Sequence, residues 1–271
     1  ERDVVRAPEP VTTVRLHNVN TGKRILAHTP VVAGRAATSA PTRLAGVPGT
    51  GTELRTEYMD PSGAVTGHLL PTGRPRTLLH PRTGTPIEVS IVDVTAPVVI
   101  AHLADVGLDP ALDIDAANAQ PALLQRLESL RAEAAVVLGL APDAAAAAAV
   151  SPAVPRVVLV GGPPGGEPGH ELVVRATSLQ RVHHACPLTS ALCTAAAAAI
   201  PGSVPASVSS LPSGGTIRLV HPKGVIEVEV KTGSNMEGTF ISSVSVARTA
   251  RRLLRGTAYV RRSGPTSPAP R

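Results

Sequence analysis

Apolar and polar residues alternate along the first quarter of the chain, which is the pattern of half-buried β-strands. These runs end at turn signals, of which Asn20-Thr21-Gly22 is the clearest. The sequence therefore predicts strands over residues 11–16, 24–32 and 52–59. Residues 74–86 carry turn residues and little apolar periodicity, which predicts a linker.

A second unit begins near residue 86, where strand-like and helix-like periods alternate. Short apolar runs predict strands over residues 87–94, 98–103, 157–160 and 172–177. Residues 121–139 instead follow a helical period, with one apolar face. The charged residues expected outside that face are Arg126, Glu128, Arg131 and Glu133. The chain therefore mixes strands and helices, as an α+β protein does.

The remaining elements follow from turn residues and local periodicity. The alanine run at 144–149 predicts a short helix or a loop, because Pro142 and Pro152 bracket it. A hairpin is expected around His221-Pro222-Lys223-Gly224. The pattern of residues 246–254 predicts a basic amphipathic helix, and a short strand is expected at Tyr259-Val260.

Residues 187–200 are the most informative helix, because they contain no charged residue at all. Pro187 suits a first helical turn, and Pro201-Gly202 ends the helix. A helix that is apolar on every side has to be buried on every side. It is too short to span a membrane, which needs about 20 residues. We therefore expect strands to wrap around it.

Composition limits the classes of partner. The 271 residues carry a net charge of +6, which favours anionic partners. Aromatic residues are nearly absent, with two Tyr, one Phe and no Trp, so a platform for stacking nucleic-acid bases is not expected. The two cysteines show no metal-ligand spacing, so neither a metal nor a disulfide is predicted. No signal peptide or membrane segment is recognisable, which favours a reduced, cytoplasmic protein.

The start of the apolar helix is the candidate binding site. Free backbone amides and the helix dipole favour a carboxylate at such an end, and Thr189 and Ser190 add hydroxyl groups. His183 precedes the helix. The alternative interpretation is that Thr189 or Ser190 only caps the helix. We interpret Cys193 as a small core residue and Cys186 as a structural residue, not a catalytic one.

Seven segments resemble the PrpF family of methylaconitate-type isomerases, and they occur in the family's order. One segment alone is weakly specific, but the ordered set spans nearly the whole chain. The segments are residues 14–25 (VRLHNVNTGKRI), 47–51 (VPGTG) with 60–63 (DPSG), 70–73 (LPTG), 178–191 (SLQRVHHACPLTSA), 221–224 (HPKG) and 248–260 (RTARRLLRGTAYV).

The resemblance implies a diaminopimelate epimerase-like fold with two lobes, each a curved sheet around a central apolar helix. It implies cofactor-independent proton transfer next to carboxylates, on small unsaturated polycarboxylates, at a site between the lobes. If the roles in the family's motif are carried over to residues 178–191, the substrate-binding residues would be Ser178, His183, Thr189 and Ser190. It implies neither a nucleic-acid nor a membrane partner, and a homodimer is compatible with it.

The chain also departs from the family pattern. The family's opening strands, first central helix, Asn-Cys-Gly-Asn motif and lysine have no counterpart here, so about a hundred residues are expected to precede Glu1. The expected catalytic Cys and Lys would lie in that segment. Within the second lobe, His184, Cys186, Ser190 and Lys223 replace the usual Lys, aromatic, Gly and Ser.

These departures set the expected domains and leave two alternatives open. Residues 1–85 would form the rear of lobe 1, with an exposed apolar sheet face, and residues 86–240 would form a complete lobe 2. Residues 241–271 would form a closing helix, a strand and a disordered tail. The chain would then be an incomplete isomerase. One alternative is a non-catalytic remnant or partner subunit that keeps the lobe 2 fold. The other is a nucleic-acid binder that uses the arginines of residues 248–262.

Overall fold

A computed structural model describes residues 7–163, 170–209, 214–236, 238–251, 253–254, 256–257 and 259. Its strands are β1 (Val11–His17), β2 (Arg24–Val32), β3 (Arg35–Ala36), β4 (Thr52–Met59), β5 (Thr77–Leu79), β6 (Ile87–Val94), β7 (Ala96–His102), β8 (Arg156–Gly161), β9 (Glu171–Ser178), β10 (Arg181–Val182), β11 (Gly215–His221), β12 (Gly224–Asn235) and β13 (Gly238–Ala250). The helices are α1 (Leu103–Val106), α2 (Ile114–Asn118), α3 (Pro121–Val137), α4 (Ala147–Val150), α5 (Leu188–Ala198) and the 3-10 turn η1 (Pro205–Ser207).

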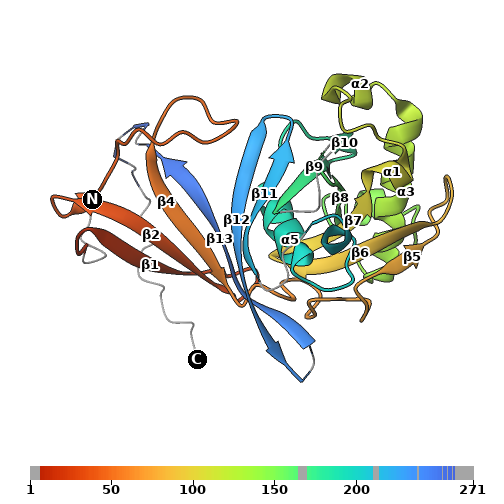
Figure 1. Cartoon of the computed structure of the whole chain (residues 1–271), viewed down its shortest axis with the longest axis horizontal. Coiled ribbons are helices and arrows are strands. Elements are labelled where there is room, and N and C mark those ends of the chain that lie inside the picture. The colour runs from red at the N-terminus through yellow and green to blue at the C-terminus, as the bar shows by residue number, and fades with distance from the viewer. Residues whose placement is uncertain are drawn as a thin grey trace, which may run out of the picture.

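The described strands form one continuous mixed sheet. Its main order is β1-β2-β4-β13-β12-β11-β9-β8-β7-β6-β5, with β3 beside β2 and β10 beside β9. The pairs β7–β8 and β9–β11 are parallel, and the other pairs are antiparallel. Figure 1 shows the sheet curling around α5 at one end and spreading open toward β1 at the other. The α+β class predicted from the sequence is confirmed.

The curled end of the sheet is buried on both faces. On β8, the side chains of Val158 and Val160 pack toward α5, while Val157 and Leu159 pack toward α1–α3. A strand covered on both faces carries a continuous apolar run instead of an alternating one. This explains why residues 157–160 read as a short apolar block in the sequence.

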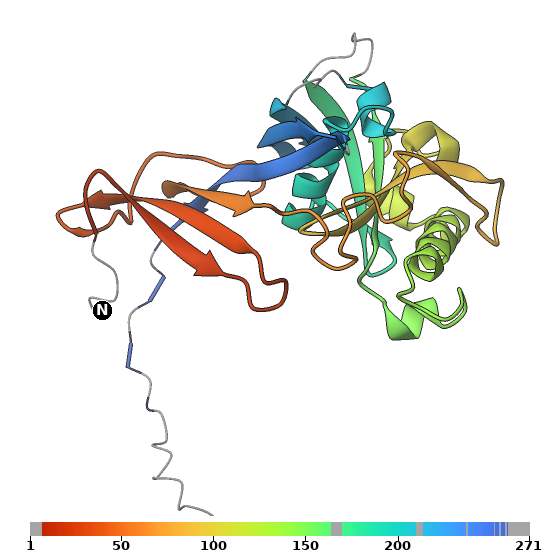
Figure 2. The same ribbon diagram turned by 90° about the horizontal axis from the view of Figure 1, so that it is seen from below.

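The open end of the sheet has no helix against it. No helix lies within residues 7–102, all of which the structure describes, and Figure 2 shows β1, β2 and β4 extending away from the helices. Val14, Leu54 and Tyr58 on these strands are only half-buried, and Leu16 is 45% exposed. Some apolar side chains of these strands are therefore partly exposed, and the division of the chain into lobes stays a prediction.

Three predictions about the elements are wrong. Residues 74–86 are not a plain linker, because β5 lies within them, pairs with β6 and buries Leu79. Residues 246–250 are not helical, because β13 continues to Ala250 and is paired on one side with β12 and on the other with β4. The strand expected at Tyr259-Val260 is not seen at Tyr259, which has no regular secondary structure, and Val260 lies outside the described residues.

Arg131 does not lie outside the buried face of α3 as predicted. Its side chain is 5% exposed. It donates to both carboxylate oxygens of Glu128 at 2.6 and 2.7 Å and to the Ser151 carbonyl at 2.6 Å. A paired arginine can be buried where a lone charge cannot. The helical spacing of apolar residues could not predict this burial, because the carbonyl that pairs with Arg131 comes from the turn after α4.

Glu57 of β4 is the centre of a polar network on the sheet face opposite the apolar one. It accepts hydrogen bonds from Ser243 at 2.7 Å and Lys231 at 2.9 Å, and its other oxygen lies 3.4 Å from His28. Burial raises the pKa of Glu57, but the contacts with Ser243, Lys231 and His28 outweigh burial, so the pKa is lowered overall.

The Glu57→Gln variant tests this network. Because the folded-state pKa of Glu57 lies below its unfolded value, the stabilisation is present above the unfolded pKa of about 4.5 and is lost as pH falls through the folded one. We expect the variant to unfold more easily by about 1 kcal/mol at pH 7. The difference from wild type should shrink below pH 4 in thermal unfolding followed by circular dichroism. A difference that stays constant between pH 7 and pH 3 would contradict the assignment.

Candidate functional site

Helix α5 positions the candidate site at its N-terminal end. Leu192, Ala195 and Ala196 have no exposed surface, and the helix contacts strands from β6 round to β13. This confirms the wrapped apolar helix predicted from residues 187–200. Pro187 precedes the first turn, and no side chain caps the helix. Thr189 and Ser190 are therefore not caps, and the first backbone amides of α5 are open to another acceptor.

Thr189 and Ser190 line a cavity of about 120 Å³ together with Arg156. Nη1 of Arg156 donates to the Thr189 hydroxyl at 2.9 Å. The Ser190 hydroxyl and Nε of Arg156 are both buried, and neither has a hydrogen-bond partner among the described residues. Unpaired buried polar atoms are costly, so their presence at one cavity suggests that a ligand completes them. The remaining wall is apolar and consists of Ala96, Pro97, Val98, Ala153 and Val154.

The charges at this cavity favour an anion. Arg156 supplies a full positive charge, and the first turn of α5 adds the positive end of the helix dipole. A carboxylate could accept from Nε of Arg156, from the Ser190 hydroxyl and from a free backbone amide. The cavity has room for a carboxylate and a few attached atoms.

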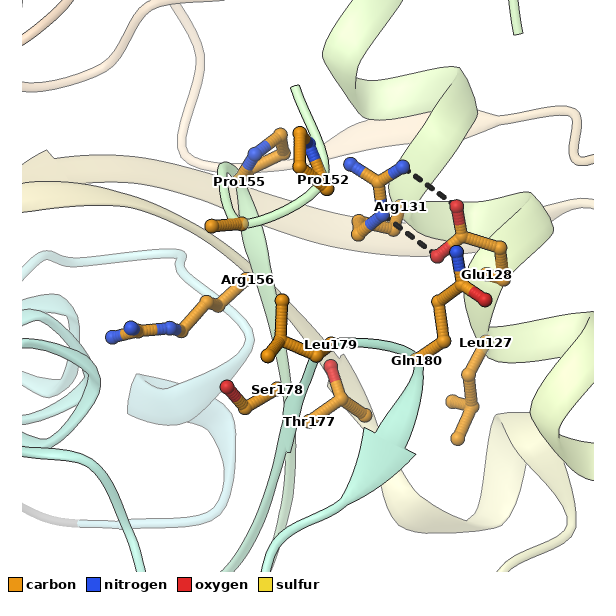
Figure 3. Close-up of a pocket in the computed structure, with 11 residues that line it drawn as sticks. Leu127, Glu128, Arg131, Pro152, Pro155, Arg156, Thr177, Ser178, Leu179 and Gln180 are labelled. Atoms are coloured by element: carbon orange, nitrogen blue, oxygen red, sulfur yellow. Dashed lines mark hydrogen bonds and ion pairs between the residues drawn. The ribbon is translucent and has the colours of Figure 1, made fainter. Parts of the chain in front are cut away.

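Ser178 lies on the other side of Arg156, in a smaller cleft. Arg156 begins β8, and Ser178 ends the neighbouring antiparallel strand β9. Both residues line this cleft, which is shown in Figure 3 with the Arg131–Glu128 pair at its far side. The Arg156 side chain extends away from that pair. Arg156 thus lies next to three of the four predicted residues: Ser178, Thr189 and Ser190.

His183 lies apart from these residues. Its ring is exposed, and Nδ1 lies 2.7 Å from the carbonyl and 3.0 Å from the amide of Ala185. The neighbouring His184 lies 3.5 Å from Asp115. His183 therefore shapes the turn that leads into α5, and it lines neither cavity described above.

Sequence reasoning missed Arg156. The available signal was a single charged residue between Pro155 and the buried run 157–160. An arginine at a strand end is ordinarily solvated, so this signal does not separate a binding residue from a surface one. Only the pairing of β8 with β9 and the packing of both against α5 bring Arg156 to Thr189.

Neither cysteine is suited to act as a base or nucleophile. Both thiols are free and buried. Burial raises the pKa of Cys186 to about 12, with a small opposing effect of Arg156. Burial also raises the pKa of Cys193, whose thiol donates to the Val92 carbonyl at 3.2 Å. Their structural role, predicted from the sequence, agrees with this burial.

Among the residues that the structure describes, no group of three or more His, Cys, Asp or Glu side chains is arranged to hold a metal ion. No helix in the described ranges is long and apolar enough to cross a membrane.

Solved structures with the same arrangement define the class of protein. A methylitaconate-delta-isomerase superposes with a TM-score of 0.80 at 32% identity, over 96% of this chain and 71% of its own. A hydroxyproline epimerase from Agrobacterium vitis superposes with a TM-score of 0.51 at 11% identity, over 90% and 60%, which concerns the fold alone. The protein therefore has the epimerase-like α+β fold.

The sequence gives the family. Residues 1–261 match the family described as PrpF protein. The 3-methylitaconate isomerase of Eubacterium barkeri is 35% identical over 277 residues, covering 97% of this chain and 71% of that protein. The chain belongs to the PrpF family, as the ordered motifs predicted, and it is an isomerase. The expected segment before Glu1 stays a prediction.

Proposed function

We propose that this isomerase moves a proton, and with it a double bond, in a small unsaturated polycarboxylate such as 2-methylaconitate. The observation that carries the proposal is the set of unpaired donors around Arg156 and Ser190 at the start of α5. The relative from Eubacterium barkeri, named for 3-methylitaconate, supports the same class of substrate. A cytoplasmic location and a homodimer stay predictions.

The role of the described residues would be to hold one carboxylate. When a base removes a proton from the carbon next to that carboxylate, the electron pair shifts toward the carboxylate oxygens. Arg156 lines the cavity, and its charge together with the first amides of α5 would stabilise the added negative charge. Return of the proton at a different carbon of the allylic system moves the double bond. We place Ser178 and Thr189 as residues that position Arg156, and Ser190 as a direct donor.

The test is deuterium wash-in. The chain would be incubated with 2-methylaconitate in D₂O, and carbon-bound hydrogens would be followed by proton NMR. We expect exchange at the carbons of the allylic system, together with growth of the isomeric acid. Absence of exchange in a folded sample, judged by its circular dichroism, would contradict the proposal for this chain and would support the non-catalytic alternative.

A further inference from the structure

The segment of residues 151–155 leads directly into Arg156, the first residue of β8. Ala153 and Val154 of this segment form part of the wall of the cavity at the start of α5. The segment has no helix or strand structure, so no ladder of backbone hydrogen bonds fixes its shape. Its position, and with it the position of Arg156, therefore depends on side chains that bond to its backbone.

Arg131 of α3 makes the first of these bonds. Its Nη1 donates to the Ser151 carbonyl at 2.6 Å, and the Ser151 hydroxyl donates in turn to the Val154 carbonyl at 2.6 Å. The first bond ties the start of the segment to α3, and the second folds the segment back on itself just before Arg156. Two hydrogen bonds thus connect α3 to the backbone that carries the arginine of the candidate site.

Glu128 fixes the direction of the Arg131 side chain. Both of its carboxylate oxygens accept from Arg131, through Nε and Nη2, which leaves Nη1 for the Ser151 carbonyl. The guanidinium group is planar, so two bonds to one carboxylate set the direction of the third donor. A buried ion pair adds little net stability, because the cost of desolvation offsets the attraction. What this pair supplies is a fixed geometry.

The pair and Arg156 also share one cleft. Pro152 and Pro155 of the segment line this cleft together with Arg131, Glu128 and Arg156, as Figure 3 shows. A change in the position of Arg131 would therefore reach Arg156 through the segment that both of them adjoin.

We propose that Arg131 is a positioning residue of the isomerase. Acting through Ser151 and the segment 151–155, it sets the place of Arg156 and of the wall at Ala153 and Val154 against the substrate carboxylate. The proposal rests on the carboxylate site put forward under the proposed function. The competing interpretation is that the Arg131–Glu128 pair only stabilises the packing of α3. The two differ in one respect: a positioning role requires Arg156, and a stabilising role does not.

A double-mutant cycle tests this difference, with kcat/KM for 2-methylaconitate as the readout. Arg131→Met should lower kcat/KM about tenfold in the wild-type background, because a small misplacement of a binding group is costly. In the Arg156→Met background the same change should cost less than about twofold, because the group being positioned is gone. A purely stabilising role gives the same factor in both backgrounds. Arg131→Lys keeps the charge but not the planar fork, and should recover only part of the loss.

Two further variants keep the test valid if Arg131→Met folds poorly. Replacing both Glu128 and Arg131 by methionine removes the pair without leaving an unpaired charge, so the melting temperature should be retained. The same tenfold loss is expected in this double variant, because the Ser151 carbonyl still lacks its donor. Ser151→Ala breaks only the bond to Val154, and should lower kcat/KM about threefold in the wild-type background.

Arg76 offers a matched control at the other end of α5. It donates to Glu88 at 2.7 Å and to the Gly202 carbonyl at 2.8 Å, which is the same combination of ion pair and backbone contact. Arg76→Met should leave kcat/KM within about twofold of wild type. Arg15→Met, which removes an exposed arginine from β1, controls for the lost charge.

The outcomes separate this proposal from the one on which it rests. Wild-type kcat/KM in Arg131→Met, or equal losses in both backgrounds of the cycle, would overturn the role of Arg131 and leave the carboxylate site intact. Wild-type kcat/KM in Arg156→Met would overturn the carboxylate site and the role of Arg131 together.

Discussion

Replacing Arg156 by methionine is expected to lower kcat/KM for the isomerisation of 2-methylaconitate about a hundredfold. The variant keeps an unbranched side chain but removes the charge that faces Thr189 and the cavity at the start of α5. Charge-assisted hydrogen bonds to a carboxylate are worth about 1.5–3 kcal/mol, and each 1.4 kcal/mol corresponds to a factor of ten. The measurement is the initial rate by NMR at several substrate concentrations.

Matched variants separate binding from folding. Arg156→Lys keeps a positive charge and should recover part of the activity, whereas Arg15→Met should retain all of it. Ser190→Ala removes an unpaired buried hydroxyl, so it should weaken substrate binding without lowering the melting temperature. Wild-type activity in Arg156→Met would show that the carboxylate is held elsewhere.

Replacing Leu192 by alanine is expected to destabilise the fold by about 2–5 kcal/mol. Leu192 has no exposed surface and lies in the core that surrounds α5. Because the strands enclose the helix, the cavity left by the missing atoms cannot collapse easily, and the loss should lie in the upper part of that range. Urea unfolding followed by circular dichroism measures the change.

Val19→Ala is the control for that prediction. Val19 is 83% exposed in the turn after β1, and its replacement should change stability by less than about 0.5 kcal/mol. A loss below 1 kcal/mol in Leu192→Ala would mean that α5 is not enclosed as described. A large loss in Val19→Ala would mean that the β1 turn is packed against something else.

Local patterns predicted most of the elements. The strands expected at residues 24–32 and 52–59 coincide with β2 and β4, and the helix expected at residues 187–200 contains α5. Each of these predictions rested on the spacing of apolar residues within one segment. Packing in the tertiary structure kept the secondary structure that this spacing favours. The false helix at residues 246–254 arose differently. Its arginines and leucines suit a helical face, but the alternation of Val244 and Val246 with serines is satisfied by pairing to two neighbouring strands.

The candidate site was predictable only in part. Thr189, Ser190 and the preceding His183 follow from the start of an uncharged helix, and the ordered motifs added Ser178. Arg156 could not be found in this way, because it belongs to the site through its contact with Thr189, which lies 33 positions away in the sequence.

The sequence by itself determined the family and the buried central helix, because an uncharged run between prolines allows no exposed face and the motifs stand in a fixed order. It also favoured a structural role over a catalytic one for both cysteines. Tertiary structure alone decided which polar atoms are left without partners. That property depends on the packing of strands far apart in the chain, which placed Arg156 beside Ser190 at the start of α5.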